Sequence, residues 1–352
     1  MPALLSVPMK SKSFVPTRPT ARSHKAKHSV IYQGDALELY PEWPSPVVIV
    51  SDGGYGVGGF PGDPLTPNGL REWYRPHVEA WSKYATPLTT LWFWNTEVGW
   101  ANVHPLLMEH GWEYVGCNIW DKGIAHVAGN VNSKTIRRFP VVTEVCVQYV
   151  KPPRFMVSGR PVHMKEWLRF EWQRSGLPLS KTNAACGVKN AATRKYFTQC
   201  HMWYFPPSEA FGKLAAYANK HGHPSGKPYF SVDGERPITT DEWEHMRSKF
   251  QLLEMGVTNV WHEPAIRGEE RIKRDDGVLH LNQKPVELIK RTITSSSDPG
   301  DVVWEPFGGL CTAAVVSDSI NRKCFSAEIL PDFYTVAVKR LSEARSHQLR
   351  LV

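Results

Sequence analysis

The stretch Asp301-Val-Val-Trp-Glu-Pro-Phe-Gly-Gly309 decides the fold of this 352-residue chain. Its apolar run through Trp304 predicts a buried strand, and the glycines that follow predict a tight turn. A helix is predicted from about Thr312, a second strand over 323–328 and a second helix over 331–345. Strands and helices that alternate in this way indicate a sheet covered by helices.

The same alternation occupies the first part of the chain. Continuous apolar runs predict strands that are buried on both faces, as in doubly wound sheets. We therefore expect an α/β fold with a doubly wound, mostly parallel, Rossmann-like sheet. The further strands are predicted over 29–32, 46–51, 88–94, 112–120 and 141–150, with helices over 36–40, 69–85 and 98–110.

Two regions depart from this pattern. Residues 1–28 are rich in Lys, Arg, Ser, Thr and Pro and contain no acid, which predicts a flexible basic arm. Residues 151–256 are rich in basic and aromatic residues and lose the alternation, which returns near Val257. One α/β domain, made of residues 29–150 and 257–352, is therefore expected to be split by an insertion.

Composition narrows the classes of function. The chain has 42 Lys and Arg against 34 Asp and Glu, a net charge of +8, which favours a polyanionic partner such as nucleic acid. A merely basic soluble protein is the alternative at this stage. No apolar run is long enough to span a bilayer, so no membrane partner is expected. None of the six cysteines lies in a C-x-x-C pair, which argues against a zinc knuckle or a disulfide framework and fits a reducing cytoplasm.

Three predicted strand ends carry residues suited to a ligand. Asp35 follows the first strand, Ser51-Asp-Gly-Gly-Tyr55 follows the second, and the turn 305–309 is followed by Glu328 at the end of the next strand. In open α/β sheets, ligands bind at the carboxyl ends of the strands. A glycine turn lets the backbone approach a ligand, and an acid on the next strand commonly holds a ribose. The pattern predicts a nucleoside cofactor.

These residues resemble a known family, the amino-directed (adenine-N6 or cytosine-N4) DNA methyltransferases that use S-adenosylmethionine. Leu281 to Lys290 and Pro299 to Gly309 are similar to that family's cofactor region. The stretch 51–55 resembles its catalytic tetrapeptide Asp-Pro-Pro-Tyr, with Gly53 and Gly54 in place of the prolines. Because the catalytic motif precedes the cofactor motif, the order resembles the circularly permuted β group.

The family's middle motifs also have counterparts here, at Ile119-Trp-Asp-Lys122 and Thr143-Glu144. The resemblance implies that 29–150 is the catalytic half, 257–352 the cofactor-binding half and 151–256 the target-recognition region. It implies S-adenosyl-L-methionine as cofactor and no metal. The residues implied to hold the cofactor are Phe307, Gly308 and Gly309 at its amino-acid part, Glu328 at the ribose, Asp35 at the adenine, and Lys284 and Pro285 at the methionine end.

The resemblance also implies a mechanism of methyl transfer. An exocyclic amine of a base is a poor nucleophile, because its lone pair is delocalised into the ring. Asp52 and the carbonyl of Gly53, followed by Gly54, would accept its two protons, and Tyr55 would stack on the flipped base. Asp ahead of the paired small residues favours adenine-N6 over cytosine-N4.

Within the insertion, helices are predicted over 164–175, 179–186 and 190–198. A short helix, a glycine turn and a basic helix resemble a helix-turn-helix over 164–199. Arg194, Lys195 and Tyr196 would then contact DNA. The alternative is an ordinary three-helix packing unit.

Together these features predict a site-specific methyltransferase that acts on double-stranded DNA in the cytoplasm, either as the modification half of a restriction–modification system or as an orphan regulator. A cognate restriction endonuclease and a second copy in a homodimer are the further partners expected. Two alternatives stay open: a methyltransferase acting on RNA or protein, and a non-catalytic DNA-binding protein on a degenerate methyltransferase scaffold.

Overall fold

A central sheet of nine strands organises the computed structural model, which describes residues 21–127, 136–252, 255–266, 273–274, 277–278 and 283–350. The strands are β1 (Ser23–Lys25), β2 (Ser29–Gln33), β3 (Val48–Ser51), β4 (Thr90–Asn95), β5 (Glu113–Asp121), β6 (Thr143–Val150), β9 (Val260–His262), β12 (Val302–Glu305) and β13 (Lys323–Glu328). Their order across the sheet is β1-β2-β13-β12-β3-β4-β6-β5-β9. Five of the eight neighbouring pairs are parallel, which confirms the mostly parallel sheet.

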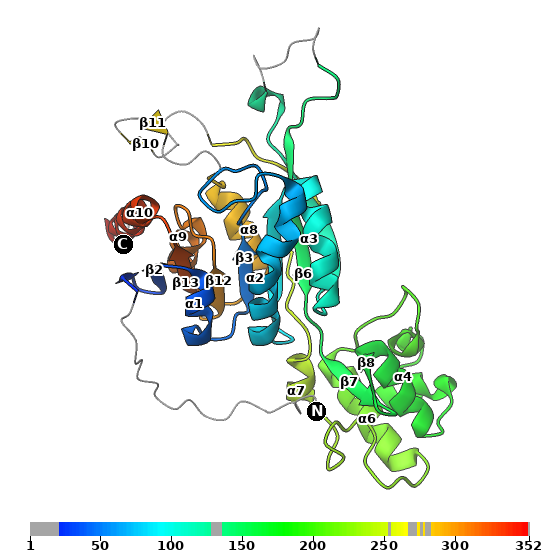
Figure 1. Ribbon diagram of the computed structural model, residues 1–352. Coiled ribbons are helices and arrows are strands. Elements are labelled where there is room, and N and C mark those ends of the chain that lie inside the picture. The colour runs from blue at the N-terminus through cyan, green and yellow to red at the C-terminus, as the bar shows by residue number, and fades with distance from the viewer. Residues whose placement is uncertain are drawn as a thin grey trace.

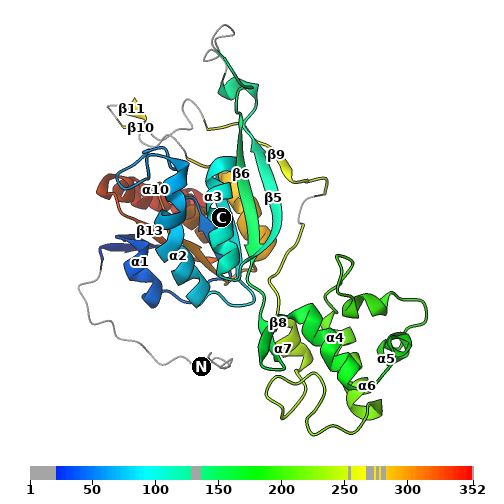
Figure 2. The ribbon, with the colours of Figure 1, turned by 45° about the vertical axis from the view of Figure 1, so that its right-hand side comes forward.

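Helices cover both faces of the sheet (Figures 1 and 2). They are α1 (Ala36–Leu39), α2 (Leu70–Tyr84), α3 (Glu97–Glu109), α8 (Val286–Ser296), α9 (Thr312–Ser319) and α10 (Pro331–Arg350), with 3₁₀ turns at Tyr40–Glu42, Pro67–Gly69 and Ile124–His126. All four residues of strand β3 are buried, so helices must cover both faces of the sheet at this strand. Val48 and Val50 pack in a core with α8, α9 and α10, while Ile49 packs in a second core with α1, α2 and α3. The doubly wound fold is therefore confirmed.

The basic arm is shorter than the sequence predicted. Residues 1–20 lie outside the described part of the chain, but Ser23–Lys25 form β1, which pairs antiparallel with β2. Backbone hydrogen bonds also join Ala26 to Ser29 and Gln33 to Arg22. The prediction that ordered structure begins at Ser29 was wrong, because pairing with an edge strand needs backbone groups and no apolar pattern.

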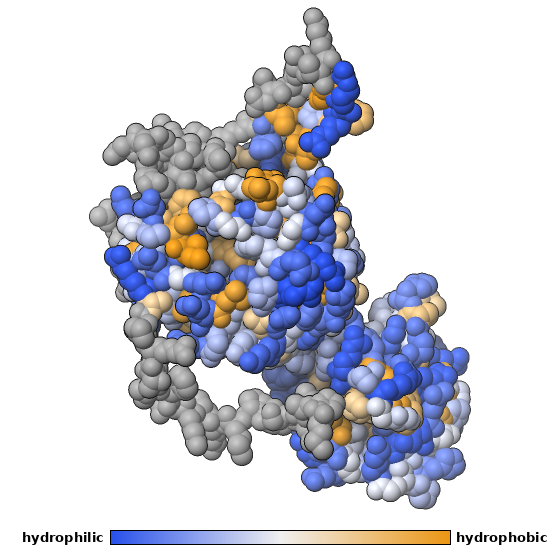
Figure 3. All heavy atoms as spheres, in the orientation of Figure 1, coloured by the Kyte–Doolittle hydropathy of each residue, from blue (hydrophilic) through white to orange (hydrophobic). Residues whose placement is uncertain are grey.

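The insertion forms a separate unit with its own apolar core (Figure 1). It contains β7 (Arg154–Val157), β8 (Arg160–His163), α4 (Met164–Arg174), α5 (Thr182–Cys186), α6 (Ser208–His221), α7 (Thr240–Glu244) and 3₁₀ turns at Leu179–Lys181 and Thr193–Phe197. Its core is built around stacked aromatic rings, such as Phe211 on Trp243 with centroids 3.9 Å apart. The face of the insertion seen in Figure 3 is mostly hydrophilic.

The predicted helix-turn-helix is only partly present. Helix α4 and the short helix before Gly187 lie where the sequence predicted them, and Gly187 takes the left-handed conformation with φ of 70°. The third segment is a 3₁₀ turn of five residues, Thr193–Phe197, rather than an α-helix over 190–198. A segment of that length cannot lie along a DNA groove as a recognition helix does.

The insertion leaves the sheet at the edge where the parallel strands begin, which we call the amino edge. Val150, the last residue of β6, pairs with Thr90 and Glu113, the first residues of β4 and β5. Glu113 also pairs with Arg154 and His163 of the insertion, at 3.0 and 3.3 Å. Figures 1 and 2 both show the insertion at this end of the sheet.

Two further short strands lie outside the main sheet. The short strands β10 (Lys273–Arg274) and β11 (Gly277–Val278) form a two-stranded pair apart from the main sheet. Across the ranges given above, no helix has the length and apolar character needed to cross a membrane.

Candidate active site

A cavity of about 850 Å³ opens at the carboxyl edge of the sheet, where the parallel strands end. It lies between the ends of β2, β3, β12 and β13 and the loop that leads into α2. Nine of the residues singled out from the sequence line it together: Asp35, Asp52, Gly53, Tyr55, Lys284, Phe307, Gly308, Gly309 and Glu328.

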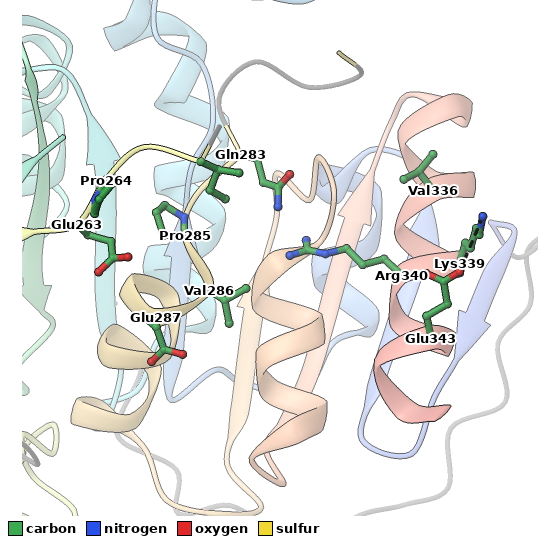
Figure 4. A pocket seen from close by; sticks show the side chains of 11 residues that line it. Glu263, Pro264, Gln283, Pro285, Val286, Glu287, Val336, Lys339, Arg340 and Glu343 are labelled. Carbon is green, nitrogen blue, oxygen red and sulfur yellow. Dashed lines mark ion pairs between the residues drawn. The ribbon is translucent and has the colours of Figure 1, made fainter. Parts of the chain in front are cut away.

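Pro285 and Gly54 do not line this cavity. Pro285 is the N-cap residue of α8 and borders a second cavity of about 550 Å³ between α8 and α10. In Figure 4, Pro285 and Glu287 lie on one side of that cavity, and Arg340 lies on the other. Gly54 turns its carbonyl into the protein, where the Asn95 amide donates a hydrogen bond to it at 2.8 Å. The predicted contact of Pro285 with the cofactor therefore stays a prediction.

Asp52 is tied to Lys284, which comes from the distant segment ahead of α8. The Lys284 ammonium donates to Asp52 Oδ1 at 2.7 Å and to the Tyr55 hydroxyl at 2.9 Å, and its third neighbour is Glu144 Oε2 at 3.3 Å. Three acceptors therefore surround the three protons of one ammonium. The resemblance placed Lys284 at the methionine end of the cofactor, whereas the structure makes it the charge partner of Asp52.

Tyr55 is fixed by its hydroxyl. That oxygen lies 3.0 Å from both Asp52 Oδ1 and Glu144 Oε2, so its single proton is donated to one carboxylate at a time. Lys122 in turn donates to Glu144 Oε1. Tyr55 as a whole is 9% exposed and borders the cavity. The tyrosine is thus anchored at its polar end and presents its ring to the site.

Burial sets the electrostatics of this cluster. Burial and the neighbouring carboxylates raise the pKa of Tyr55 well above its usual value, so its phenol stays protonated. Burial opposes the charge on Lys284, but Asp52 and Glu144 outweigh it and raise the pKa of that ammonium. Burial likewise opposes the charge on Glu144, but Lys284 and Lys122 lower its pKa. The cluster is a buried network of ion pairs around one neutral tyrosine.

The glycine turn after β12 is shaped for close approach of a ligand. A side chain at Gly308 would meet Cys311 Sγ at 2.7 Å and the Ala327 carbonyl at 2.9 Å, and Gly309 has φ of 53°. Glycine tolerates both situations at little cost, whereas a residue with a Cβ would clash at 308 and be strained at 309. The turn thus exposes its backbone to the cavity.

Glu305, at the start of this turn, joins β12 to α9 and β13 through hydrogen bonds. The sequence analysis did not predict this role. Its carboxylate accepts from the N–H groups of Ala313 and Ala314 at the start of α9, at 2.7 and 3.0 Å, and from the Ser326 hydroxyl at 2.7 Å. Burial raises its pKa to about 7. The signal that could have found it was an acid ending a buried strand directly ahead of a helix N-terminus.

Glu328 ends β13 and faces the cavity from the other side of the turn. Its two oxygens accept from the N–H groups of Gly309 and Leu330, and burial raises its pKa to about 7. Asp35 lies nearby at the end of β2, where its Oδ1 accepts from the Leu37 N–H at 2.9 Å and caps α1. Both acids are therefore held in place before any ligand arrives.

Phe307 contributes an aromatic wall. Its ring packs against His77, Trp73 and Tyr74 of α2, with centroid distances of 4.7, 5.3 and 5.9 Å. Burial lowers the pKa of His77 to about 4, so this wall is uncharged at neutral pH. The cavity thus has an uncharged aromatic wall, and Asp52 and Glu328 line it as well.

Arg194, Lys195 and Tyr196 lie on the insertion, apart from the cavity. Arg194 is exposed, and the Lys195 ammonium lies 4.9 Å from the centroid of the Tyr204 ring. Because the insertion hangs from the amino edge and the cavity opens at the carboxyl edge, the structure does not bring these three residues to the site. Their contact with DNA remains a prediction.

A Rossmann-like sheet with a glycine turn, two acids and an Asp–Lys–Tyr cluster at its carboxyl edge fits the class of enzymes that use a nucleoside cofactor. A family model described as DNA methylase matches residues 48–339. The chain therefore belongs to the DNA methylase family, which confirms the family and the fold expected from the sequence.

Similar proteins agree with this membership. The chain is 39% identical over 88 residues to the type II methyltransferase M.HinfI of Haemophilus influenzae, covering 25% of this chain and 24% of that protein. It is 37% identical over 86 residues to the DNA adenine methyltransferase YhdJ of Escherichia coli strain K12, covering 24% and 28%. These matches span only about a quarter of the relatives' lengths.

Likeness among solved structures extends over more of the chain. PvuII DNA methyltransferase, described as cytosine-N4-specific, has a TM-score of 0.50 and 12% identity, covering 91% of both chains. At that identity the likeness supports the fold.

Proposed function

We propose that this protein is a site-specific DNA methyltransferase that uses S-adenosylmethionine to methylate the exocyclic amine of a flipped base. The observation that carries the proposal is the asymmetric use of the Asp52 carboxylate. Lys284 and Tyr55 both bind Oδ1, while Oδ2 has no hydrogen bond from any residue that the structure describes. The side chain is 23% exposed at the wall of the cavity. One oxygen is therefore anchored and the other is available to a substrate.

The residues present fit the proposed cofactor. The cavity combines a backbone cradle at Gly308 and Gly309, where a Cβ at 308 would clash, with a carboxylate on the adjacent strand. Glu328 would hold the ribose hydroxyls, Phe307 and the two glycines the amino-acid part, and Asp35 the adenine. When bound, S-adenosylmethionine supplies an electrophilic methyl group.

The residues of the chain would act on the target amine. Asp52 Oδ2 and the Gly53 carbonyl accept hydrogen bonds from its two protons, which directs the nitrogen lone pair toward the methyl group. The Tyr55 ring stacks on the flipped base, while its hydroxyl keeps its hydrogen bonds to Asp52 and Glu144. Asp52 then takes the proton that the nitrogen loses, and Lys284 stabilises the carboxylate until that point.

Adenine-N6 is the favoured target because Asp, rather than Ser, precedes the paired glycines. The adenine-specific name of one relative supports this choice, whereas the cytosine-specific title of the structural neighbour favours the other base. The type II names of several relatives support a restriction–modification role. A cognate endonuclease and a homodimer are further expectations of that role.

The decisive experiment is single-turnover transfer of a labelled methyl group on saturated complexes. Asp52→Asn should lower the rate on the order of 10²- to 10⁴-fold with little change in cofactor binding. The control is Asp298→Asn, an exposed acid ahead of β12 that pairs with Lys249, and it should keep the wild-type rate. Label on RNA or protein rather than DNA, or an Asp52→Asn rate near that of the control, would contradict the proposal.

A further inference from the structure

The catalytic turn of this chain holds two glycines where the family's usual tetrapeptide has prolines. Prolines stiffen a turn by fixing φ, whereas glycines leave it free. Neither Gly53 nor Gly54 is among the glycines with positive φ, so their backbone conformation does not demand glycine. The reason for glycine must therefore lie in the space around the turn.

Side chains from other elements fill that space. A Cβ on Gly53 would lie 2.7 Å from the Tyr74 hydroxyl and 2.7 Å from Phe307 Cδ2. A Cβ on Gly54 would lie 2.9 Å from Asp63 Oδ1. Contacts of that length cannot be accommodated without movement, so a proline at either position would displace these side chains.

The same side chains hold the turn through hydrogen bonds. The Gly54 carbonyl, directly ahead of Tyr55, accepts from the Asn95 amide at 2.8 Å and from the Tyr74 hydroxyl at 3.2 Å. Directly after Tyr55, the backbone N–H groups donate to one carboxylate. Asp63 accepts from Gly56, Val57 and Gly59 at 2.9, 3.2 and 3.0 Å.

The three side chains are themselves fixed. Tyr74 and Asn95 are fully buried, and Asp63 is 7% exposed. Tyr74 belongs to α2, and Asn95 ends β4, the strand beside β3. Hydrogen bonds at sites excluded from solvent are stronger, and cost more free energy to break, than hydrogen bonds at the surface.

We propose that Tyr74, Asn95 and Asp63 form a clamp that replaces the stiffness of the paired prolines and positions Asp52 and Tyr55 for catalysis. The inference rests on the proposed function for its effect on rate. The clamp needs glycine at 53 and 54, because only glycine leaves room for the clamping side chains.

The test compares Tyr74→Phe with Tyr149→Phe. Each removes one hydroxyl from a fully buried tyrosine, but the Tyr149 hydroxyl bonds Trp100 and His104, away from the turn. Tyr74→Phe should slow single-turnover methyl transfer by roughly 10- to 100-fold, with cofactor and DNA affinities within about twofold of wild type. Tyr149→Phe should keep the wild-type rate.

Amide hydrogen exchange gives a readout that does not depend on activity. Asp63→Ala should speed exchange at Gly56, Val57 and Gly59 by about 10-fold, while Tyr149→Phe should not. Gly54→Ala should have a similar effect by displacing Asp63, so the double variant should be no worse than either single one.

The outcomes separate the clamp from the proposed function. Absence of methyl transfer by the wild-type chain would refute the function, and exchange alone would then decide the clamp. Unchanged exchange in Asp63→Ala would overturn the clamp. Faster exchange with an unchanged transfer rate in an active enzyme would overturn its positioning role.

Discussion

At the scale of single residues, Glu328 is the group whose protonation should control cofactor binding. Burial raises the pKa of its carboxyl to about 7 from an ordinary value of 4.5, although two backbone N–H groups bind it. A ribose diol donates two hydrogen bonds, and only the ionised carboxylate offers both oxygens as acceptors. Binding should therefore need the deprotonated form.

We expect the affinity for S-adenosylmethionine to rise as the pH increases from about 6 to about 8. Glu328→Gln should bind more weakly, and its affinity should vary little over the same range. Calorimetric titrations at constant ionic strength measure both. A wild-type affinity that stays constant across this range would contradict the assignment.

The raised pKa of Glu328 also affects the stability of the ligand-free protein, which changes with pH in the direction opposite to the cofactor affinity. Because the folded form holds the proton more tightly than the unfolded form, this contribution is fully present below about pH 4.5 and is lost as the pH rises through about 7. The cofactor-binding form of Glu328 is thus the less stable one.

The sequence predicted these residues because their signals are local. Asp52, Glu328 and the glycine turn each follow a buried strand, and strand ends meet at one edge of a parallel sheet. The partners of Asp52 were not predictable in the same way. Lys284 stands 232 positions away from it, and the motif gave no sign that its ammonium would reach the carboxylate.

At the scale of elements, one ammonium joins three segments of the fold. Lys284 precedes α8, Asp52 follows β3, and Glu144 lies on β6. The side chain of Lys284 is only 2% exposed, so the two carboxylates near it share a poorly hydrated site. Removing the cation would leave these like charges close together, with Asp52 without an ion-pair partner and Glu144 paired with Lys122 alone.

We predict that Lys284→Met lowers the free energy of unfolding by about 3–5 kcal/mol. Adding Glu144→Gln removes one of the two carboxylate charges that repel each other and should restore part of that loss. The effects of the two substitutions on the free energy of unfolding should therefore be strongly non-additive. Urea denaturation measures each value. Lys290→Met, which removes an exposed lysine from α8, is the control and should change little. Additive effects would show that the network is not coupled.

The elements that the sequence predicted well are those with a buried, periodic pattern of their own, such as β3 and α2. Two of the elements that were not predicted correctly illustrate different reasons. Strand β1 is a basic edge strand that exists through pairing with β2. The segment around Arg194 had the composition of a helix, yet tertiary packing within the insertion left it a 3₁₀ turn.

At the scale of the whole molecule, the insertion and the cavity belong to opposite edges of the sheet. The insertion follows Val150, the last residue of β6, and the cavity lies beyond the other end of that strand, where Glu144 contacts Tyr55. The eight residues of β6 span about 26 Å at ~3.3 Å per residue. That length equals about eight base pairs of duplex at ~3.4 Å each.

For the proposed DNA substrate bound at the cavity of the same copy, this separation limits the groups that Arg194 can contact. A side chain so far from the methylated base can touch phosphates of flanking duplex, but it cannot read the bases next to the target. Phosphate contacts carry no sequence information and act through charge. A role in the affinity for every sequence therefore fits the fold better than a role in specificity.

We predict that Arg194→Glu weakens binding to specific and nonspecific duplexes by similar factors and reduces the salt dependence of binding. Lys220→Glu makes the same change of charge at another exposed position of the insertion and should have a much smaller effect. Salt titrations with both duplexes measure these quantities. A loss of affinity confined to the specific duplex would mean that Arg194 contacts base edges. Within this architecture, such contacts would require the insertion of a second copy of the chain to lie at the site.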